Sequence, residues 1–285
     1  MLRISVPATS ANVGPGFDVF GLAIEMRNEF IIRDAESFDD DNLIYYAYKR
    51  TYQRLGLEPE PISVENVAVV PMARGLGSSS TCIVAGVAAA LYKIKGEINK
   101  DFLLEIATDL EGHPDNVAPA IYGHFVVSVM DEGQVYYTVH KLHDDLRFIA
   151  IMPDFELATE KAREILPGTI SRSDGIFNVS RACLLIPALE NMDEEKIRIG
   201  LNDRFHQPYR KGLIPGYEEV VKVAKKLGVI GCYLSGAGPT IMAVVNKKDE
   251  EIINDLTGYI KSTFPSWRAE TFKIDEKGII IEEVD

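Results

Sequence analysis

The chain has 285 residues, of which 46% are hydrophobic and 26% are charged, and its formal net charge at pH 7 is −13. This composition is typical of a soluble globular protein, and the length favours two domains that share a cleft. The negative charge opposes sequence-independent binding of nucleic acid. A phosphate ligand would therefore have to be held by local features and not by a basic surface.

The cysteines and the apolar segments bear on the compartment. Cys82, Cys183 and Cys232 are odd in number, widely spaced and set among apolar residues, which indicates buried free thiols in a reducing compartment. The segment LRISV at the start lacks the basic and apolar regions of a signal peptide. The longest apolar run, near residues 83–91, is too short to cross a bilayer. We therefore expect a cytoplasmic protein with no membrane partner.

Two strands and a long loop open the chain. Residues 2–6 alternate apolar and polar side chains, which predicts an edge or half-buried strand that the following proline ends. The loop 7–18, PATSANVGPGFD, places Asn12 and Asp18 among small and turn-forming residues before a strand over 19–26. A hairpin connection is the plain alternative, but the loop is long for a hairpin, and long ordered loops are disproportionately functional. We favour a functional loop.

A glycine-rich segment follows three predicted elements, a strand over 30–33, a helix over 40–53 and a strand over 62–70. The segment is PMARGLGSSST, residues 71–81, whose glycines let the backbone approach a ligand and whose serines and threonine add hydroxyls. The apolar run after it has helical spacing, so we expect Ser78 or a neighbour to cap a helix whose N-terminus suits a phosphate. An ordinary glycine turn is equally compatible with the pattern. The missing Lys-Ser or Lys-Thr ending excludes a Walker P-loop.

A second cluster of polar residues follows the next predicted helix. The segment EGHPDN contains Glu111, His113, Asp115 and Asn116, a group that a hydrophobic core does not need. Glu111 could reach a Mg²⁺ ion held mainly by phosphates, and the other three side chains could hydrogen-bond a polar substrate. The structural alternative is that Asp115 or Asn116 caps a helix that begins at residue 117.

The second half of the chain contributes arginines. Charged residues over 141–147 indicate a domain boundary before a strand at 148–152. Thr159 and Arg163 lie four residues apart and therefore on one face of the next helix, while Arg210 lies in a loop between helical stretches. Arginines at a cleft commonly bind carboxylates with two hydrogen bonds, although solvated surface arginines are the more frequent case.

The remaining elements follow from the same periodicities. Helices are predicted over 100–110, 173–190, 193–203 and 249–261, and strands over 125–130, 134–139, 229–234, 241–245, 268–274 and 278–281. The segment SGAGPT, residues 235–240, is a second glycine-rich turn, which either touches a phosphate or only joins two strands.

Three segments, TSANVGPGFDVFG, PMARGLGSSST and EGHPDNVAPAIYG, occur in this order with SGAGPT as a fourth, and together they resemble the homoserine kinases. The resemblance spans most of the chain. The middle segment resembles the phosphate loop of the wider superfamily of galactokinase, homoserine kinase, mevalonate kinase and phosphomevalonate kinase (GHMP). Relatives in the mevalonate branch usually carry a lysine in the first motif, where this chain has Ala8, Thr9 and Ser10.

The resemblance implies an α+β fold of two domains, the two-domain GHMP kinase fold. A ribosomal-protein-S5-like, nucleotide-binding domain is expected over 1–145, and a ferredoxin-like domain that completes the substrate cleft is expected over 146–285. The implied activity is ATP-dependent phosphorylation of the L-homoserine side-chain hydroxyl to O-phospho-L-homoserine, a step of threonine biosynthesis. The implied partners are homoserine and ATP, and a homodimer is allowed.

The resemblance also assigns site residues, with Mg²⁺ at Ser79 and Glu111 and with Ser78 and Asp109 as alternatives left open. The expected ATP loop comprises Pro71, Met72, Ala73, Arg74, Gly75, Leu76, Gly77, Ser78, Ser79, Ser80 and Thr81. The expected homoserine site comprises Asn12, Asp18, His113, Asp115, Thr159, Arg163 and Arg210. The catalytic candidates are Asp115, His113, Asn116 and Arg210. The acids suit the ammonium group and the arginines suit the carboxylate, while the existence of a general base is left open.

Some positions depart from the family pattern. Thr81 and Cys82 replace the usual pair of small alanines beside the phosphates, and His124 stands where the family commonly has glycine. Two other functions stay open, namely another GHMP small-molecule kinase and a non-catalytic sensor that keeps the nucleotide and amino-acid sites. The intact acidic and basic site residues argue against the sensor.

Overall fold

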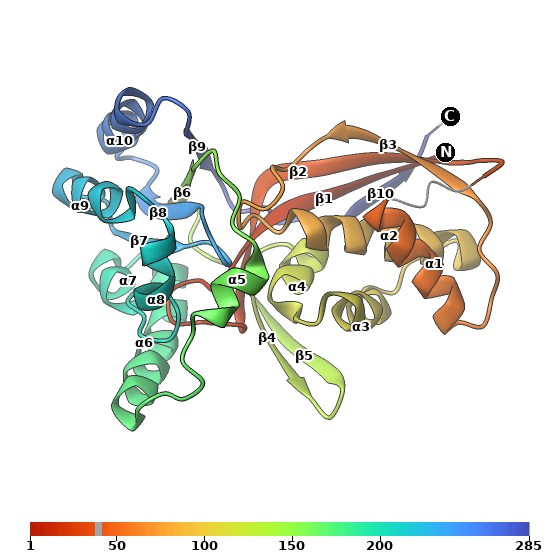
Figure 1. Ribbon diagram of the computed structural model, residues 1–285, viewed down its shortest axis with the longest axis horizontal. Coiled ribbons are helices and arrows are strands. Elements are labelled where there is room, and N and C mark those ends of the chain that lie inside the picture. Colours follow the sequence, from red (N-terminus) through yellow and green to blue (C-terminus); the bar gives the residue numbers. More distant parts are fainter. Residues whose placement is uncertain (38–41, 285) are drawn as a thin grey trace.

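The computed structural model describes residues 1–37 and 42–284. Within this part of the chain there are one six-stranded and one four-stranded sheet, and every pair of neighbouring strands is antiparallel (Figure 1). Each sheet has its own set of helices. The architecture is therefore α+β, as predicted.

The larger sheet has the strand order β10–β1–β2–β4–β5, and β3 pairs with β2. Its strands are β1 (Leu2–Ala11), β2 (Phe20–Asp34), β3 (Ile62–Ala68), β4 (Phe125–Asp131), β5 (Gln134–His140) and β10 (Ile280–Glu283). The helices packed on it are α1 (Leu43–Arg54), α2 (Ser78–Lys95), α3 (Lys100–Glu111) and α4 (Pro114–Tyr122). They lie together on one face of this sheet (Figure 1).

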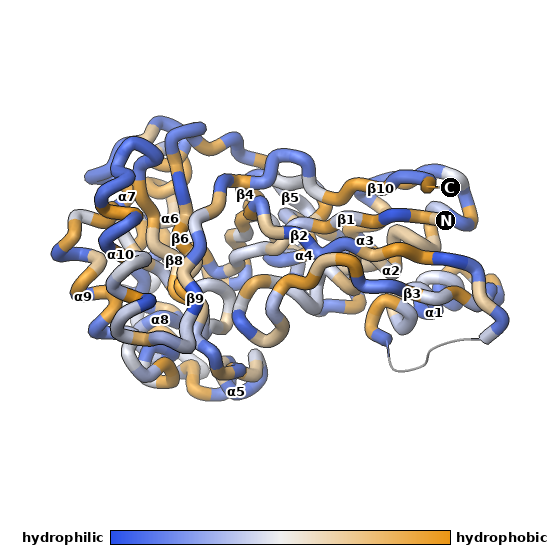
Figure 2. Tube along the Cα trace, turned by 90° about the horizontal axis from the view of Figure 1, so that it is seen from above, coloured by the Kyte–Doolittle hydropathy of each residue, from blue (hydrophilic) through white to orange (hydrophobic). Residues whose placement is uncertain are grey.

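The smaller sheet has the order β7–β8–β6–β9. Its strands are β6 (Leu146–Met152), β7 (Gly231–Leu234), β8 (Ile241–Asn246) and β9 (Arg268–Phe272). The helices around it are α5 (Thr159–Glu164), α6 (Arg172–Asn191), α7 (Glu194–Gly200), α8 (Gln207–Arg210), α9 (Tyr217–Leu227) and α10 (Glu250–Thr263), with a 3-10 turn at Lys211–Leu213. Strands β6 and β8 are mainly hydrophobic (Figure 2) and almost wholly buried.

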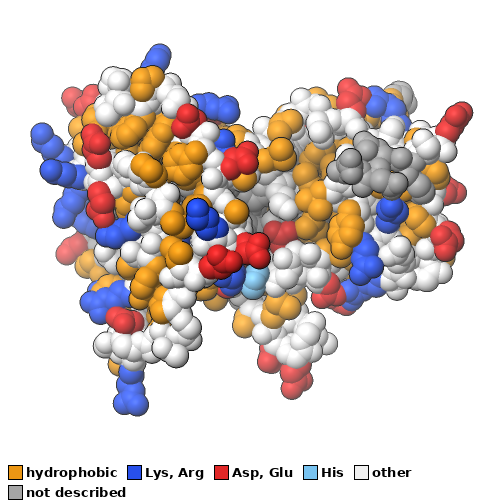
Figure 3. Space-filling model, viewed as in Figure 1, with side chains coloured by type: hydrophobic (Ala, Val, Ile, Leu, Met, Phe, Trp, Pro, Cys, Tyr) orange, Lys and Arg blue, Asp and Glu red, His pale blue; other side chains and the backbone are white. Residues whose placement is uncertain are grey.

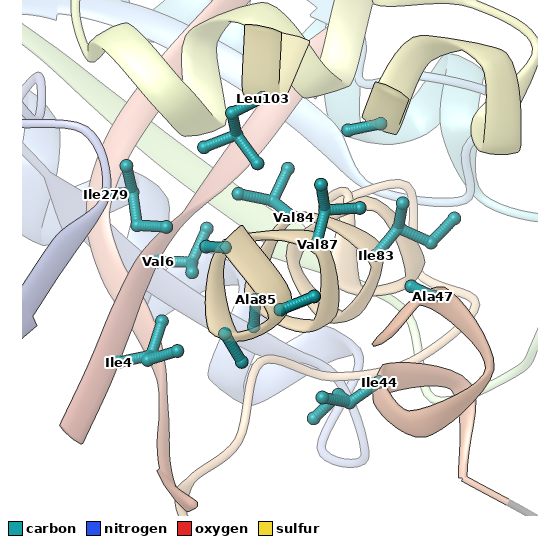
Figure 4. Packing of buried hydrophobic residues seen from close by; sticks show 14 of the residues in the cluster. Ile4, Val6, Ile44, Ala47, Ile83, Val84, Ala85, Val87, Leu103 and Ile279 are labelled. Carbon is teal, nitrogen blue, oxygen red and sulfur yellow. The ribbon is translucent and has the colours of Figure 1, made fainter. Parts of the chain in front are cut away.

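Helix α2 forms the centre of the first half. Every residue from Ile83 to Leu91 is buried, because the sheet and the other three helices surround this segment. Figure 4 shows side chains of β1, α1 and α3 converging on it. The small residues of α2 permit this close packing: a β-carbon at Gly86 would lie 2.1 Å from the carbonyl oxygen of Ile44. The glycine-rich loop is therefore attached to a rigid element.

The first two strands are longer than predicted. Strand β1 does not end at Pro7; it continues to Ala11 and lies between β10 and β2 instead of at an edge. The register shifts between Pro7 and Ala8, and such an irregularity accommodates a residue that has no N–H for the ladder. Strand β2 includes both of the strands predicted over 19–26 and 30–33. The loop between β1 and β2 is correspondingly shorter.

The two halves share apolar packing. One hydrophobic cluster combines Leu22 and Phe125 of the larger sheet with Phe148 and Met242 of the smaller sheet. The predicted division between residues 145 and 146 falls beside the start of β6, but β10 returns to the larger sheet and pairs with β1. The end of the predicted second domain thus completes the sheet of the first.

The other predicted elements occur with shifted ends, and α9 was not predicted. The predicted start of the first helix at Asp40 lies outside the described residues. All three cysteines are free as predicted, but none is fully buried: Cys82 and Cys232 are half-buried and Cys183 is exposed. Among the helices that the structure describes, none combines the length and the apolar character needed to cross a membrane.

Candidate active site

A cavity of about 180 Å³ opens where the two halves meet. Figure 3 shows a hollow between the halves, with acidic side chains and a histidine at its edge. The cavity is lined by Asn12, Asp18, residues 73–80, Glu111, His113, Asp115, Asn116, Thr159, Arg163, Arg210, Gly236 and Ala237. All the side chains predicted to bind homoserine therefore meet in one place, although their roles stay predictions.

The glycine-rich loop reaches the cavity in a conformation that favours glycine. Gly75 and Gly77 have φ angles of +74° and +64°. Of Ser78 and its neighbours, which were predicted to cap α2, the neighbour Gly77 occupies the N-cap position, without a side-chain cap. The Ser78 hydroxyl instead donates to the carbonyl of Val70 (3.0 Å). The first N–H groups of α2 are thus left without a side-chain acceptor at the positive end of the helix dipole, which suits a phosphate.

The serines after Gly77 have different environments. Ser79 is exposed and lines the cavity, whereas Ser80 is buried and donates a hydrogen bond to Oε1 of Glu111 (2.7 Å). Burial raises the pKa of the Glu111 carboxyl. Asp109, the weaker predicted alternative, forms an exposed ion pair with Arg54 and does not line the cavity. The assignment of Mg²⁺ to Ser79 and Glu111 stays a prediction.

The EGHPDN segment forms the start of α4. His113 occupies the N-cap position and Pro114 opens the helix, so the structural alternative, in which Asp115 or Asn116 caps a helix that begins at residue 117, is wrong. Proline fits a first helical turn because its fixed φ is already helical and its missing N–H is not needed there. A β-carbon at Gly21 of β2 would lie 1.8 Å from the carbonyl oxygen of Asp115. This glycine lets α4 approach the sheet.

Asp115 is almost fully buried at the base of the cavity, with an exposed fraction of 5%. Burial, together with the nearby carboxylates of Asp18 and Glu111, raises its pKa to about 7. Desolvation and like charge both disfavour the ionised form of a carboxyl group. Asp115 is therefore suited to taking up and releasing a proton near neutral pH.

Asp18 and Arg163 form a bidentate ion pair in which both N···O distances are 2.9 Å. The loop that carries Asp18 is shaped by Asn12, whose side-chain oxygen accepts from the backbone N–H of Asp18 (2.8 Å). Both loop residues have left-handed backbone conformations. Asn12 therefore has a defined role in holding Asp18, and the Arg163 charge is already balanced.

Arg210 lies in the short helix α8 and not in a loop as predicted, and its exposed fraction is only 1%. Its Nε donates to the carbonyl of Ala162 (2.9 Å) and its Nη1 donates to the carbonyl of Gly236 (3.1 Å). Burial and the nearby Arg163 lower the pKa of Arg210 to about 10. Both guanidinium groups contact the ring of Phe17, so the two arginines converge as predicted.

The turn 235–240 clamps the glycine-rich loop to the second half of the molecule. The Ser235 hydroxyl donates to the carbonyl of Gly75 (2.5 Å), and the backbone N–H of Thr240 donates to the carbonyl of Arg74 (3.3 Å). A β-carbon at Gly75 would lie 2.3 Å from the carbonyl oxygen of Ser235. The turn therefore does more than join two strands, since it also supplies Gly236 to the cavity wall.

Some predicted loop residues lie outside the cavity. Pro71, Met72 and Thr81 do not line it; Thr81 is fully buried and donates to the carbonyl of Ser78 (2.7 Å). His124 has a left-handed backbone (φ +62°) and lines a separate cavity of about 700 Å³.

Comparisons with known proteins agree with this architecture. The family models described as GHMP kinases N terminal domain and GHMP kinases C terminal match residues 42–124 and 185–260. A homoserine kinase of Clostridium beijerinckii is 42% identical, with 99% of each chain covered, and one of Clostridium botulinum is 41% identical over the full length of both chains. The crystal structure of homoserine kinase from Cytophaga hutchinsonii has a TM-score of 0.86 at 28% identity, covering 99% of this chain and 97% of that one.

The two-domain α+β fold, with a glycine-rich loop facing a cavity between the halves, is that of the GHMP kinases. Because the full-length relatives exceed 40% identity, the resemblance can be stated more narrowly. The chain belongs to the homoserine kinase family.

Proposed function

We propose that the chain transfers the γ-phosphoryl group of ATP to the side-chain hydroxyl of L-homoserine, giving O-phospho-L-homoserine and ADP. The observation that carries this proposal is a single cavity that unites the glycine-rich loop with the acids and arginines suited to an amino-acid zwitterion. The relatives named above are called homoserine kinases, and they match this chain over nearly their full length. We place the reaction in threonine biosynthesis and the protein in the cytoplasm.

The buried arginine sets the orientation of the substrate. Backbone carbonyls hold Nε and Nη1 of Arg210, so its guanidinium group is fixed before a substrate carboxylate arrives. Asp18 lies in the same cavity and is assigned to the ammonium group. With both ends of the zwitterion held, the hydroxyl group points toward the glycine-rich loop, where we place the γ-phosphate.

The chemistry is an in-line displacement at phosphorus. The homoserine hydroxyl oxygen forms a bond to the γ-phosphorus, and the bond from that phosphorus to the β,γ-bridging oxygen breaks, with its electron pair leaving on ADP. We assign the released hydroxyl proton to the carboxylate of Asp115, because its pKa of about 7 lets it accept a proton at neutral pH. Positioning and neutralisation of charge supply most of the acceleration.

Ser79 and Glu111 fit a Mg²⁺ ion that ATP itself mainly holds. Both line the cavity, and the hydroxyl of Ser79 is on an exposed residue. In the described part of the chain no three His, Cys, Asp or Glu side chains form a metal-binding group. A Mg²⁺ ion that is bound through phosphates requires only a few protein ligands. When bound, the ion would neutralise charge on the phosphates.

An assay of ADP release with Mg-ATP tests the proposal. We expect turnover with L-homoserine and little turnover with mevalonate or a sugar. Turnover with mevalonate or a sugar alone would assign the chain to another branch of the superfamily. Calorimetry that detects binding of both homoserine and ATP, without formation of product, would instead favour a sensor.

A further inference from the structure

Thr9 contacts both segments that form the phosphate side of the cavity. It lies on β1 opposite Ala23 of β2 and is fully buried. Its hydroxyl donates a hydrogen bond to Oδ1 of Asn116 (2.7 Å), and its backbone N–H donates to the carbonyl of Leu76 (3.1 Å). One uncharged residue therefore links the glycine-rich loop, through its backbone, to the start of α4, through its side chain.

The position of the Thr9 hydroxyl depends on the glycine that ends the loop. A β-carbon at Gly77 would lie 1.9 Å from Oγ1 of Thr9 and 3.0 Å from Oδ1 of Asn116. The hydroxyl thus occupies the space that any larger residue at 77 would need. Because Thr9 is β-branched and lies on a central strand, its hydroxyl has little freedom to rotate away.

In the structure, the oxygen end of the Asn116 carboxamide faces Thr9. A carboxamide has an acceptor end and a donor end, and the two are interchanged by a simple rotation. With Oδ1 held by Thr9, the Nδ2 donors are directed to the cavity that Asn116 lines. Among the residues that the structure describes, none accepts a hydrogen bond from Nδ2 of Asn116.

We propose that Thr9 is a positioning residue for phosphoryl transfer, which holds Asn116 so that its Nδ2 donates to the oxygen atoms around the reacting phosphorus. This inference rests on the proposed function. Negative charge spreads over those oxygens as the phosphoryl group transfers, and a fixed donor stabilises that charge without reorganisation. A carboxamide that rotates freely would present its carbonyl oxygen part of the time. The loss should therefore appear in kcat and not in the binding of either substrate.

A double-mutant cycle tests the proposal. In Thr9→Val we expect kcat to fall about ten-fold or more, while the KM values for homoserine and ATP change by less than about two-fold. Thr9→Ser keeps the hydroxyl and should restore most of the lost kcat. In an Asn116→Ala background, Thr9→Val should have almost no further effect, because the group that Thr9 positions is already gone.

The matched control is Thr51→Val in α1. Thr51 is also fully buried and donates a hydrogen bond of 2.8 Å to the carbonyl of Ala47, far from the cavity lining. It should keep the wild-type kcat. If valine at position 9 prevents folding, Thr9→Ala removes the hydroxyl without placing a methyl group against Gly77.

Three results would overturn the inference. One is an equal loss from Thr9→Val with and without the Asn116 side chain, and another is a Thr9→Ser enzyme as slow as Thr9→Val. The third is a rise in KM at unchanged kcat. Failure of the proposed function is distinguishable, because it would appear as wild-type enzyme without homoserine turnover. The cycle would then be measured with whichever alcohol the enzyme phosphorylates.

Discussion

The two walls of the cavity are built in different ways. The phosphate wall, residues 73–80 and 111–116, presents the backbone of the glycine-rich loop at the start of the buried helix α2, beside the polar residues that join α3 to α4. The homoserine wall presents the long charged side chains of Arg163 and Arg210 from the short helices α5 and α8. The difference indicates that the glycine-rich loop of the first wall acts through shape and that the second wall acts through charge. Added atoms should damage the first wall, whereas lost charge should change the selectivity of the second.

The largest effect is expected from Gly77→Ala. The added methyl group would lie 1.9 Å from Oγ1 of Thr9, and alanine is strained at φ +64°. A displaced loop misplaces the phosphates, so kcat should fall by more than about 100-fold. The free energy of unfolding should fall by about 1–3 kcal/mol. Steady-state kinetics and denaturant unfolding measure the two effects.

Gly96→Ala is the matched control for that change. Gly96 follows the last residue of the same helix with φ +73°, but a β-carbon there would meet nothing within 4 Å. This variant should lose only the stability that the strained φ costs, about 1 kcal/mol. Equal kinetic losses at both glycines would contradict the view that the phosphate wall acts through local shape.

The next effect concerns the proton acceptor of the phosphate wall. With a pKa of about 7 for Asp115, kcat/KM of the wild type should rise with pH through neutrality as the carboxyl ionises. Asp115→Asn should lower kcat roughly 100-fold and abolish that rise. A wild-type profile that is flat between pH 6 and 8 would exclude Asp115 as the base.

The same carboxyl links stability to pH. Its pKa is higher in the folded chain than in the unfolded chain, so the folded state binds the extra proton between about pH 4 and pH 7. The stabilising contribution is complete below that interval and is lost as the pH rises through 7. At pH 8, Asp115→Asn should therefore raise the free energy of unfolding by on the order of 1–3 kcal/mol. Thermal denaturation at pH 5 and pH 8 would detect the difference.

The two walls also differ in how far the sequence predicts them. The glycine-rich loop and EGHPDN are each an uninterrupted segment of sequence, so their composition predicts the phosphate wall. The resemblance to a known family was needed to predict that the distant arginines lie in the same site. Local patterns could not predict the contacts of Ser80 with Glu111 or of Thr9 with Asn116, whose partners are 31 and 107 residues apart. The predicted end of β1 was wrong because the strand continues past Pro7 through an irregularity in its pairing with β2. These features depend on tertiary packing, which overrides local preference.

The smallest effect on rate, and the clearest on selectivity, is expected from Arg210→Met in the homoserine wall. Methionine approximates the length of the arginine stem but cannot donate to a carboxylate. Losing one charge-assisted partner should lower kcat/KM for homoserine about ten-fold to a hundred-fold and leave the KM for ATP nearly unchanged. The carbonyls of Ala162 and Gly236 also lose a donor, so some stability is lost as well.

A comparison of substrates separates recognition from this structural cost. The wild type should prefer homoserine to its carboxyl ester, and Arg210→Met should lose that preference because it no longer has the charged partner of the carboxylate. A general weakening of the fold would instead affect both substrates alike. Arg163→Met should lose less of it, since Asp18 already balances the Arg163 charge and the Arg163 side chain is 41% exposed. If Arg210→Met and the wild type discriminate equally against the ester, Arg210 does not bind the carboxylate. Its hydrogen bonds to the carbonyls of Ala162 and Gly236 would then serve only to join α5 to the turn after β7, and the charge-based view of this wall would be wrong.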